Sequence, residues 1–136
     1  MSTIVVGYVP KPEGRAALRR AVEEARLRGA RLIVINSARG GRDFDADDAV
    51  DSEAELDAVR AELAAAGVEA EVRQLVRGLD VAEDLIAVAQ DTSADFIVIG
   101  LRRRSPVGKL ILGSNAQRIL LDAPCPVLSV KAGEAE

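Results

Sequence analysis

The sequence predicts an α/β protein: an open five-stranded parallel sheet in the order 3-2-1-4-5, with helices on both faces. Short β-rich runs alternate with amphipathic helical patterns along the chain, which is typical of a parallel sheet with right-handed crossovers. The first and fourth runs are the most apolar, so we expect them inside the sheet, where helices cover both faces. The length of 136 residues suits a single domain, expected to span residues 1–136.

The first two strands are expected at Thr3–Val9 and Arg31–Ser37, with a helix at Glu13–Arg28 between them. Apolar residues three and four positions apart mark the buried face of this helix: Leu18, Ala21, Val22 and Ala25. On its other face Glu24 is four residues from both Arg20 and Arg28, a spacing that favours ion pairs. Gly29 then provides a natural end to the helix.

Asp43–Asp57 is the most acidic segment of the chain and contains no Lys or Arg. We expect a solvated loop whose acids favour the N-terminus of the following helix. The alternative, a divalent-metal site, lacks the spacing and the glycine of an EF-hand. Ser52 and Glu55 match a capping box, so the second helix is expected to begin there. Its apolar face is Leu56, Val59 and Leu63, and Gly67 ends it.

The second half of the chain repeats the alternation. Val68–Val76 alternates apolar and charged residues, so this third strand is expected at a sheet edge. Strands four and five are expected at Asp95–Gly100 and Pro126–Lys131. Two more helices are expected, and these residues define them: Asp80, Glu83, Leu85, Ile86, Val88 and Ala89 for the third; Ser114, Gln117, Ile119, Leu120 and the terminating Pro124 for the fourth.

The composition excludes several kinds of chemistry. The chain has no histidine and a single cysteine, so it has no Ser–His or Cys–His pair, no internal disulfide and no Cys-rich metal site. We expect Cys125, between two prolines, to pack as a small apolar side chain. Acidic residues outnumber basic ones by 22 to 18, which argues against nucleic acid as a partner. With neither a signal-peptide pattern nor a long apolar run, we expect a cytoplasmic protein without membrane contact.

The order of the expected sheet reverses between strands one and four, and ligands of such sheets bind outside the carboxyl ends of the strands at that point. Two loops meet there, Pro10–Gly14 and Leu101–Gly113. The second carries four basic residues and leads into Gly113 and Ser114 at a helix start, where backbone N–H groups and the helix dipole favour an anion. The pattern predicts a phosphate site, although each residue alone also fits a cap, a turn or a solvated loop. Neither a Walker A loop nor a dinucleotide-binding glycine motif is present.

The sequence resembles the universal stress protein family over its whole length. The resemblance rests on the order of strands and helices, on DFIVIG leading into an arginine- and glycine-containing loop, on LILGS before a helix, and on APCPVLSVK. It implies a Rossmann-like fold of the adenine nucleotide alpha hydrolase type and a role in the stress response as a binding module, not an enzyme. It also implies ATP or AMP as ligand, with Mg²⁺ only alongside ATP.

The resemblance further implies partners. The last strand is apolar and lies at a sheet edge, where unpaired backbone groups invite another strand. A homodimer is therefore expected through Val127, Leu128, Ser129 and Val130, with an unidentified protein as a further partner. The alternative is an edge covered by the C-terminal tail.

By the same resemblance, Gly100, Gly113, Ser114 and Asn115 would hold the phosphates, and Ser37 would lie by the adenine. The remaining expected site residues are Tyr8, Val9, Pro10, Ile99, Arg102 and Arg103. Two positions depart from the family pattern, because Val9 stands where an aspartate is usual and Arg103 where a glycine is usual. These departures keep open a protein that binds no nucleotide, or only a small anion. A slow ATP hydrolase is the weakest alternative, since no water-activating base is evident.

Overall fold

The computed structural model describes residues 2–8, 12–36, 46–74, 81–101 and 114–131. Its five strands form one parallel sheet in the order β3-β2-β1-β4-β5, which confirms the predicted topology. The strands are β1 (Thr3–Tyr8), β2 (Arg31–Asn36), β3 (Ala70–Gln74), β4 (Phe96–Leu101) and β5 (Val127–Lys131). Strand β1 lies in the middle, and its register sets Tyr8 beside Asn36 of β2 and Val6 beside Val98 of β4.

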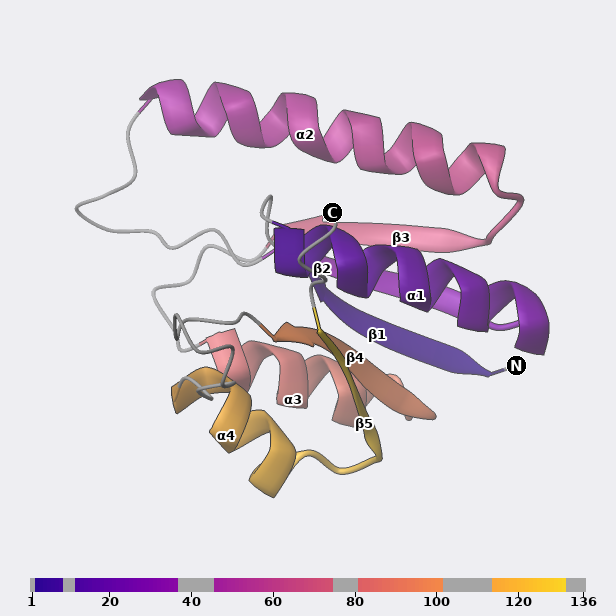
Figure 1. The fold of residues 1–136 in the computed structure, drawn as a ribbon, viewed down its shortest axis with the longest axis vertical. Helices are drawn as coiled ribbons and strands as arrows, with labels where there is room; N and C mark the ends of the chain where they lie inside the picture. The colour runs from indigo at the N-terminus through magenta and orange to yellow at the C-terminus, as the bar shows by residue number, and fades with distance from the viewer. Residues whose placement is uncertain (1, 9–11, 37–45, 75–80, 102–113, 132–136) are drawn as a thin grey trace.

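Four helices cover the two faces of the sheet in pairs (Figure 1). They are α1 (Pro12–Arg28), α2 (Ala46–Ala65), α3 (Val81–Asp91) and α4 (Ser114–Asp122). Helices α1 and α2 pack on one face, and α3 and α4 pack on the other. Because successive strand residues point to opposite faces, the interior strands supply apolar side chains to both layers and read as almost continuous apolar runs.

The core follows this division of the strand residues. Ile4, Val6 and Tyr8 of β1 pack towards α1 and α2, whereas Val5 packs towards α3 and α4. Strand β2 divides its residues in the same way. Helices α1 and α2 are each followed by a glycine with positive φ, Gly29 at 62° and Gly67 at 72°. Both helix ends were expected at these glycines, since other residues rarely adopt this left-handed conformation.

Two sequence predictions about the helices are wrong. Helix α2 begins at Ala46, so most of the acidic segment is helical and Ser52 lies inside the helix instead of capping it. Glu55 therefore does not complete a capping box, and its carboxylate accepts a hydrogen bond from Tyr8 instead. Leu120, expected on the buried face of α4, is 41% exposed, whereas its neighbour Ile119 is buried. Consecutive residues of a helix point about 100° apart, so when Ile119 faces the core its neighbour Leu120 is turned towards solvent.

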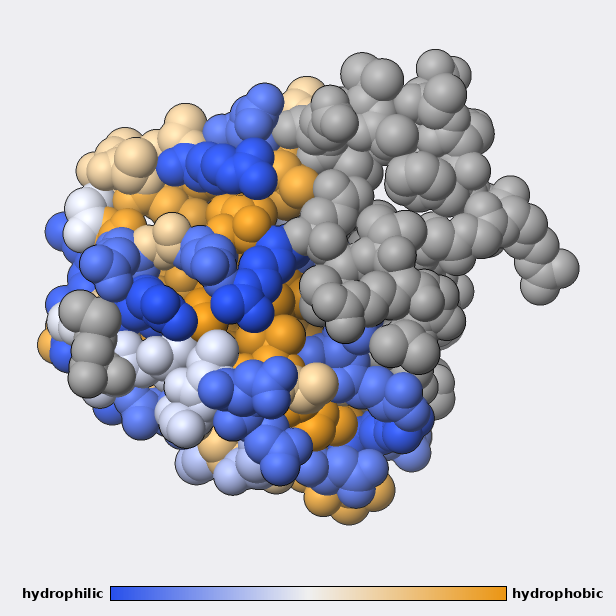
Figure 2. Space-filling view, turned by 180° about the vertical axis from the view of Figure 1, so that it is seen from behind, coloured by the Kyte–Doolittle hydropathy of each residue, from blue (hydrophilic) through white to orange (hydrophobic). Residues whose placement is uncertain are grey.

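The outer surface of α1 carries the expected ion pairs. The carboxylate of Glu24 lies 3.3 Å from Arg20 and 3.2 Å from Arg28. The guanidinium of Arg28 also lies over the ring of Phe96, 5.1 Å from its centroid. Seen from behind, the described surface shows strips of apolar residues between hydrophilic ones (Figure 2). Within the described ranges, no helix is both long and apolar enough to cross a membrane.

Replacing Leu85 by alanine is expected to destabilise the fold by about 2–5 kcal/mol, because this fully buried side chain would leave a cavity between α3 and the sheet. Leu27→Ala is the matched control, since Leu27 is 81% exposed and its removal is expected to change stability by less than about 0.5 kcal/mol. Chemical denaturation monitored by circular dichroism measures both. Equal losses in the two variants would contradict the packing described here.

Candidate functional site

The carboxyl ends of the strands meet at one edge of the sheet, together with the N-termini of the helices (Figure 1). Strands β1 and β4 pair side by side, and the chain leaves β1 for one face and β4 for the other. The edge between β1 and β4 is thus the point where the strand order reverses. This confirms the topological switch point that the sequence predicted, and it is where open α/β sheets hold their ligands.

Gly100 is the residue on which this edge closes. A Cβ atom added to it would lie 2.0 Å from the carbonyl oxygen of Glu13 and 3.1 Å from the Cβ of that residue. The first turn of α1 therefore rests directly on the backbone of β4. Gly100 was expected to hold a phosphate, and in the structure its backbone also packs against the backbone of α1.

Tyr8, at the end of β1, is bound to helix α2. Its side chain is only 2% exposed, and its hydroxyl donates a hydrogen bond to Oε1 of Glu55. The same oxygen lies 3.8 Å from the guanidinium of Arg15 in α1. Burial, and then the hydrogen bond to Glu55 and its charge, raise the pKa of Tyr8 above its ordinary value. The phenol therefore remains a neutral donor across the physiological pH range.

The structure brings some of the predicted site residues to this edge. Gly100 lies there, and α4 begins at Ser114 with Asn115 in its first turn, which confirms the predicted helix start. The side chains of Ser114 and Asn115 are not described. Ile99 is buried between β4 and the α3/α4 layer, so its side chain faces the core. The other predicted site residues lie outside the described ranges: Val9, Pro10, Ser37, Arg102, Arg103 and Gly113.

Two polar residues at this edge were missed by the sequence analysis. Asn36 ends β2, is buried, and lies beside Tyr8 in the register of the sheet. Its signal was a polar residue at the end of an otherwise apolar run, LIVIN. Glu55 gave no readable signal, because its partner Tyr8 lies 47 residues away and the local sequence matched a capping box instead.

Among the described residues, no group of three or more acidic or cysteine side chains could hold a metal ion. Cys125 is partly buried and packs against the α3/α4 layer, as expected of a small apolar side chain. Burial, followed by the charge of Asp95, raises the pKa of its thiol, which makes it a poorer nucleophile.

Fold and edge together define a class of protein: a parallel α/β domain whose switch-point edge carries Gly100, near the end of β4, and the N-terminus of α4. Residues 1–131 match the model of the universal stress protein family. The chain belongs to this family, which confirms the resemblance drawn from the sequence.

Relatives of known sequence and structure agree with this assignment. A universal stress protein of Mycolicibacterium smegmatis is 48% identical over 128 residues, which cover 94% of this chain and 96% of the relative. A universal stress protein of Archaeoglobus fulgidus superposes with a TM-score of 0.82 at 38% identity, covering 96% of this chain and 99% of that one. The universal stress protein of the same organism in complex with dAMP has a TM-score of 0.76 at 32% identity, covering 96% and 98%.

Gly100→Ala is expected to destabilise the protein by about 1–3 kcal/mol or more, because the added methyl group would collide with backbone that cannot yield without moving α1. Gly7→Ala is the matched control in β1. Its Cβ would lie 3.0 Å from Cδ1 of Leu85, the movable end of a side chain, so a smaller loss is expected. Urea denaturation of the two variants measures the difference, and a Gly100 variant as stable as the Gly7 variant would contradict the close approach.

Proposed function

We propose that this protein binds an adenine nucleotide, AMP or ATP, at the carboxyl edge between β1 and β4 and acts in the stress response through that binding. The single observation that carries the proposal is the position of the N-terminus of α4. It lies at the same edge as Gly100, where backbone N–H groups and the helix dipole favour a phosphate. The base and ribose would then extend towards β1 and β2, where Tyr8 and Asn36 lie side by side.

The dAMP complex of the Archaeoglobus fulgidus relative supports the ligand class, since that protein is 32% identical over nearly the whole chain. The proposed phosphate ligands are Gly100, Gly113, Ser114 and Asn115. Arg102 and Arg103 would add guanidinium groups, which bind phosphate in a fork. Ser37, Val9 and Pro10 would border the nucleoside, and Mg²⁺ would accompany ATP only.

Val9 and Arg103 set the expected affinity. Valine cannot accept a hydrogen bond from a ribose hydroxyl, and the loss of one such bond costs about 1–3 kcal/mol, roughly tenfold or more in affinity. At position 103 arginine replaces the glycine of the family pattern: it strains the loop if a left-handed conformation is needed there, and it adds a phosphate-binding fork if it is not. The proposed role is one of binding without hydrolysis. The same two residues favour a second candidate, an interaction protein whose cleft holds only a small anion.

Isothermal titration with AMP and ATP tests the proposal. Heat of binding is expected for both nucleotides, and Ser114→Ala is expected to weaken it by about tenfold, because a hydrogen bond to a charged phosphate is lost. Arg26→Ala is the control, since Arg26 is exposed in the last turn of α1, at the opposite edge of the sheet. Absence of heat with either nucleotide at about 1 mM, a concentration that detects even weak affinity, would contradict the proposal. Heat with inorganic phosphate alone would favour the second candidate.

We further propose that two copies pair through β5, with the homodimer formed by Val127, Leu128, Ser129 and Val130. Strand β5 pairs only with β4 in the described chain, and these four residues are partly exposed. Sedimentation equilibrium is expected to give twice the chain mass of 14.4 kDa. Ser129→Lys is expected to shift the protein towards the monomer, because a charge on an edge strand opposes pairing. A wild-type protein that stays monomeric at every concentration tested would contradict this arrangement.

A further inference from the structure

We propose that Glu55 of α2 is a positioning residue for the nucleotide site, because it holds both ends of the connection between β1 and α1 in place. This inference rests on the proposed function for its effect on nucleotide affinity. The tether itself is a property of the fold and can be tested without any nucleotide.

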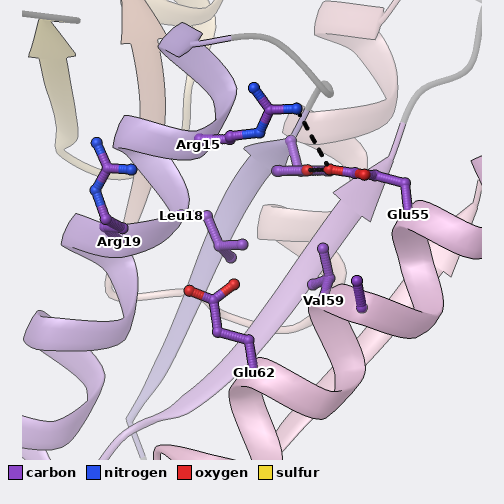
Figure 3. A pocket seen from close by; sticks show the side chains of 8 residues that line it. Arg15, Leu18, Arg19, Glu55, Val59 and Glu62 are labelled. Carbon is purple, nitrogen blue, oxygen red and sulfur yellow. Dashed lines mark hydrogen bonds and ion pairs between the residues drawn. The ribbon is translucent and has the colours of Figure 1, made fainter. Parts of the chain in front are cut away.

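The tether is formed by one carboxylate and two partners. Tyr8 is the last residue of β1 and donates its hydroxyl to Oε1 of Glu55. Arg15 lies in the first turn of α1, and its guanidinium lies 3.8 Å from the same oxygen. Figure 3 shows Arg15 extending from α1 towards Glu55, with both interactions drawn as dashed lines. The end of β1 and the first turn of α1 are thus both held by one carboxylate on α2.

The burial of Tyr8 makes its hydrogen bond to Glu55 costly to lose. The Tyr8 hydroxyl is buried with its side chain, so water cannot readily replace the carboxylate as its acceptor. The Glu55 side chain is 32% exposed, so this carboxylate is partly shielded from solvent. A hydrogen bond from a buried phenol to a carboxylate is charge-assisted and therefore strong.

Next to the tether, α1 and α2 leave a hollow of about 110 Å³ between them. Leu18 of α1 and Val59 of α2 line this hollow. Glu62, which lies on the same face of α2 as Glu55, extends towards Leu18 (Figure 3). The helices are thus not packed tightly along this seam. Arg15 and Glu55 bridge it near the carboxyl edge, where the position of α1 decides the shape of the ligand site.

The tether has a specific consequence for the nucleotide site. Val9 has no polar side-chain group, so the groups that the start of α1 offers a nucleotide are its backbone N–H groups. These N–H groups are useful to a ligand only if they are held in place. By fixing Tyr8 and Arg15, Glu55 holds the end of β1 and the first turn of α1 at the edge where Gly100 meets Glu13.

The test combines local hydrogen exchange with titration of AMP on the full-length protein. Glu55→Ala and Tyr8→Phe are expected to raise amide exchange at residues 16–19 of α1, whose N–H groups are the first that the helix itself can bond. Both variants are also expected to weaken AMP binding by about fivefold to tenfold, in the range of couplings through positioned elements. Glu55→Gln keeps an acceptor for Tyr8 and loses the charge that attracts Arg15, so an intermediate effect is expected. Glu62→Ala is the matched control on the same helix face and is expected to leave both quantities within about twofold.

Leu63→Ala separates a tether from general stability. It removes a buried contact of α2 with the core and leaves Glu55 intact, so it is expected to raise exchange across α2 and not selectively at residues 16–19 of α1. Equal local exchange in Leu63→Ala and Glu55→Ala, or unchanged exchange in folded Glu55→Ala and Tyr8→Phe, would overturn the inference. If Glu55→Ala does not fold, Glu55→Gln and Tyr8→Phe decide the matter. If the wild type binds no AMP, the proposed function fails, and the exchange measurements still test the tether.

Discussion

The structure depends on the direct contact between the backbone of β4 and the first turn of α1. At Gly100 there is no room for a side chain, since a Cβ atom would meet the carbonyl oxygen of Glu13 at 2.0 Å. This contact brings the start of α1 over the point where the strand order reverses. Strands β1 and β4 end beside this contact and α1 begins there, so the contact fixes the positions of the groups that a ligand at this edge would meet.

Much of the fold was predictable from the sequence because its signals are local. Apolar runs such as DFIVIG, helix ends at Gly29 and Gly67, and the alternation of strand and helix together limit the topology to a few choices. The role of Glu55 was not predictable, since its partner Tyr8 is distant in sequence and a capping pattern with Ser52 offered a plausible local reading. The exposure of Leu120 could not be read either, because it depends on the orientation of α4 against its neighbours.

The candidate site was predictable in its place and in part of its composition. The switch point, Gly100 and the start of α4 at Ser114 follow from topology and helix-capping chemistry. Tyr8 was expected to line the site, whereas the structure turns its side chain towards α2, where it serves Glu55. Within the described ranges, this edge carries the backbone N–H groups at the starts of α1 and α4, the amide of Asn36 and the carboxylate of Glu55 bound to Tyr8.

The central claim is that an adenine nucleotide occupies the carboxyl edge between β1 and β4, and nuclear magnetic resonance tests it most directly. In a titration of ¹⁵N-labelled protein with AMP, the account predicts that the amide signals of Gly14, Gly100, Leu101 and Ser114 shift in proportion to occupancy. The signals of Ala30 and Ala94, at the opposite edge of the sheet, are expected to stay in place. Shifts confined to that opposite edge, or no shifts at all, would contradict the account.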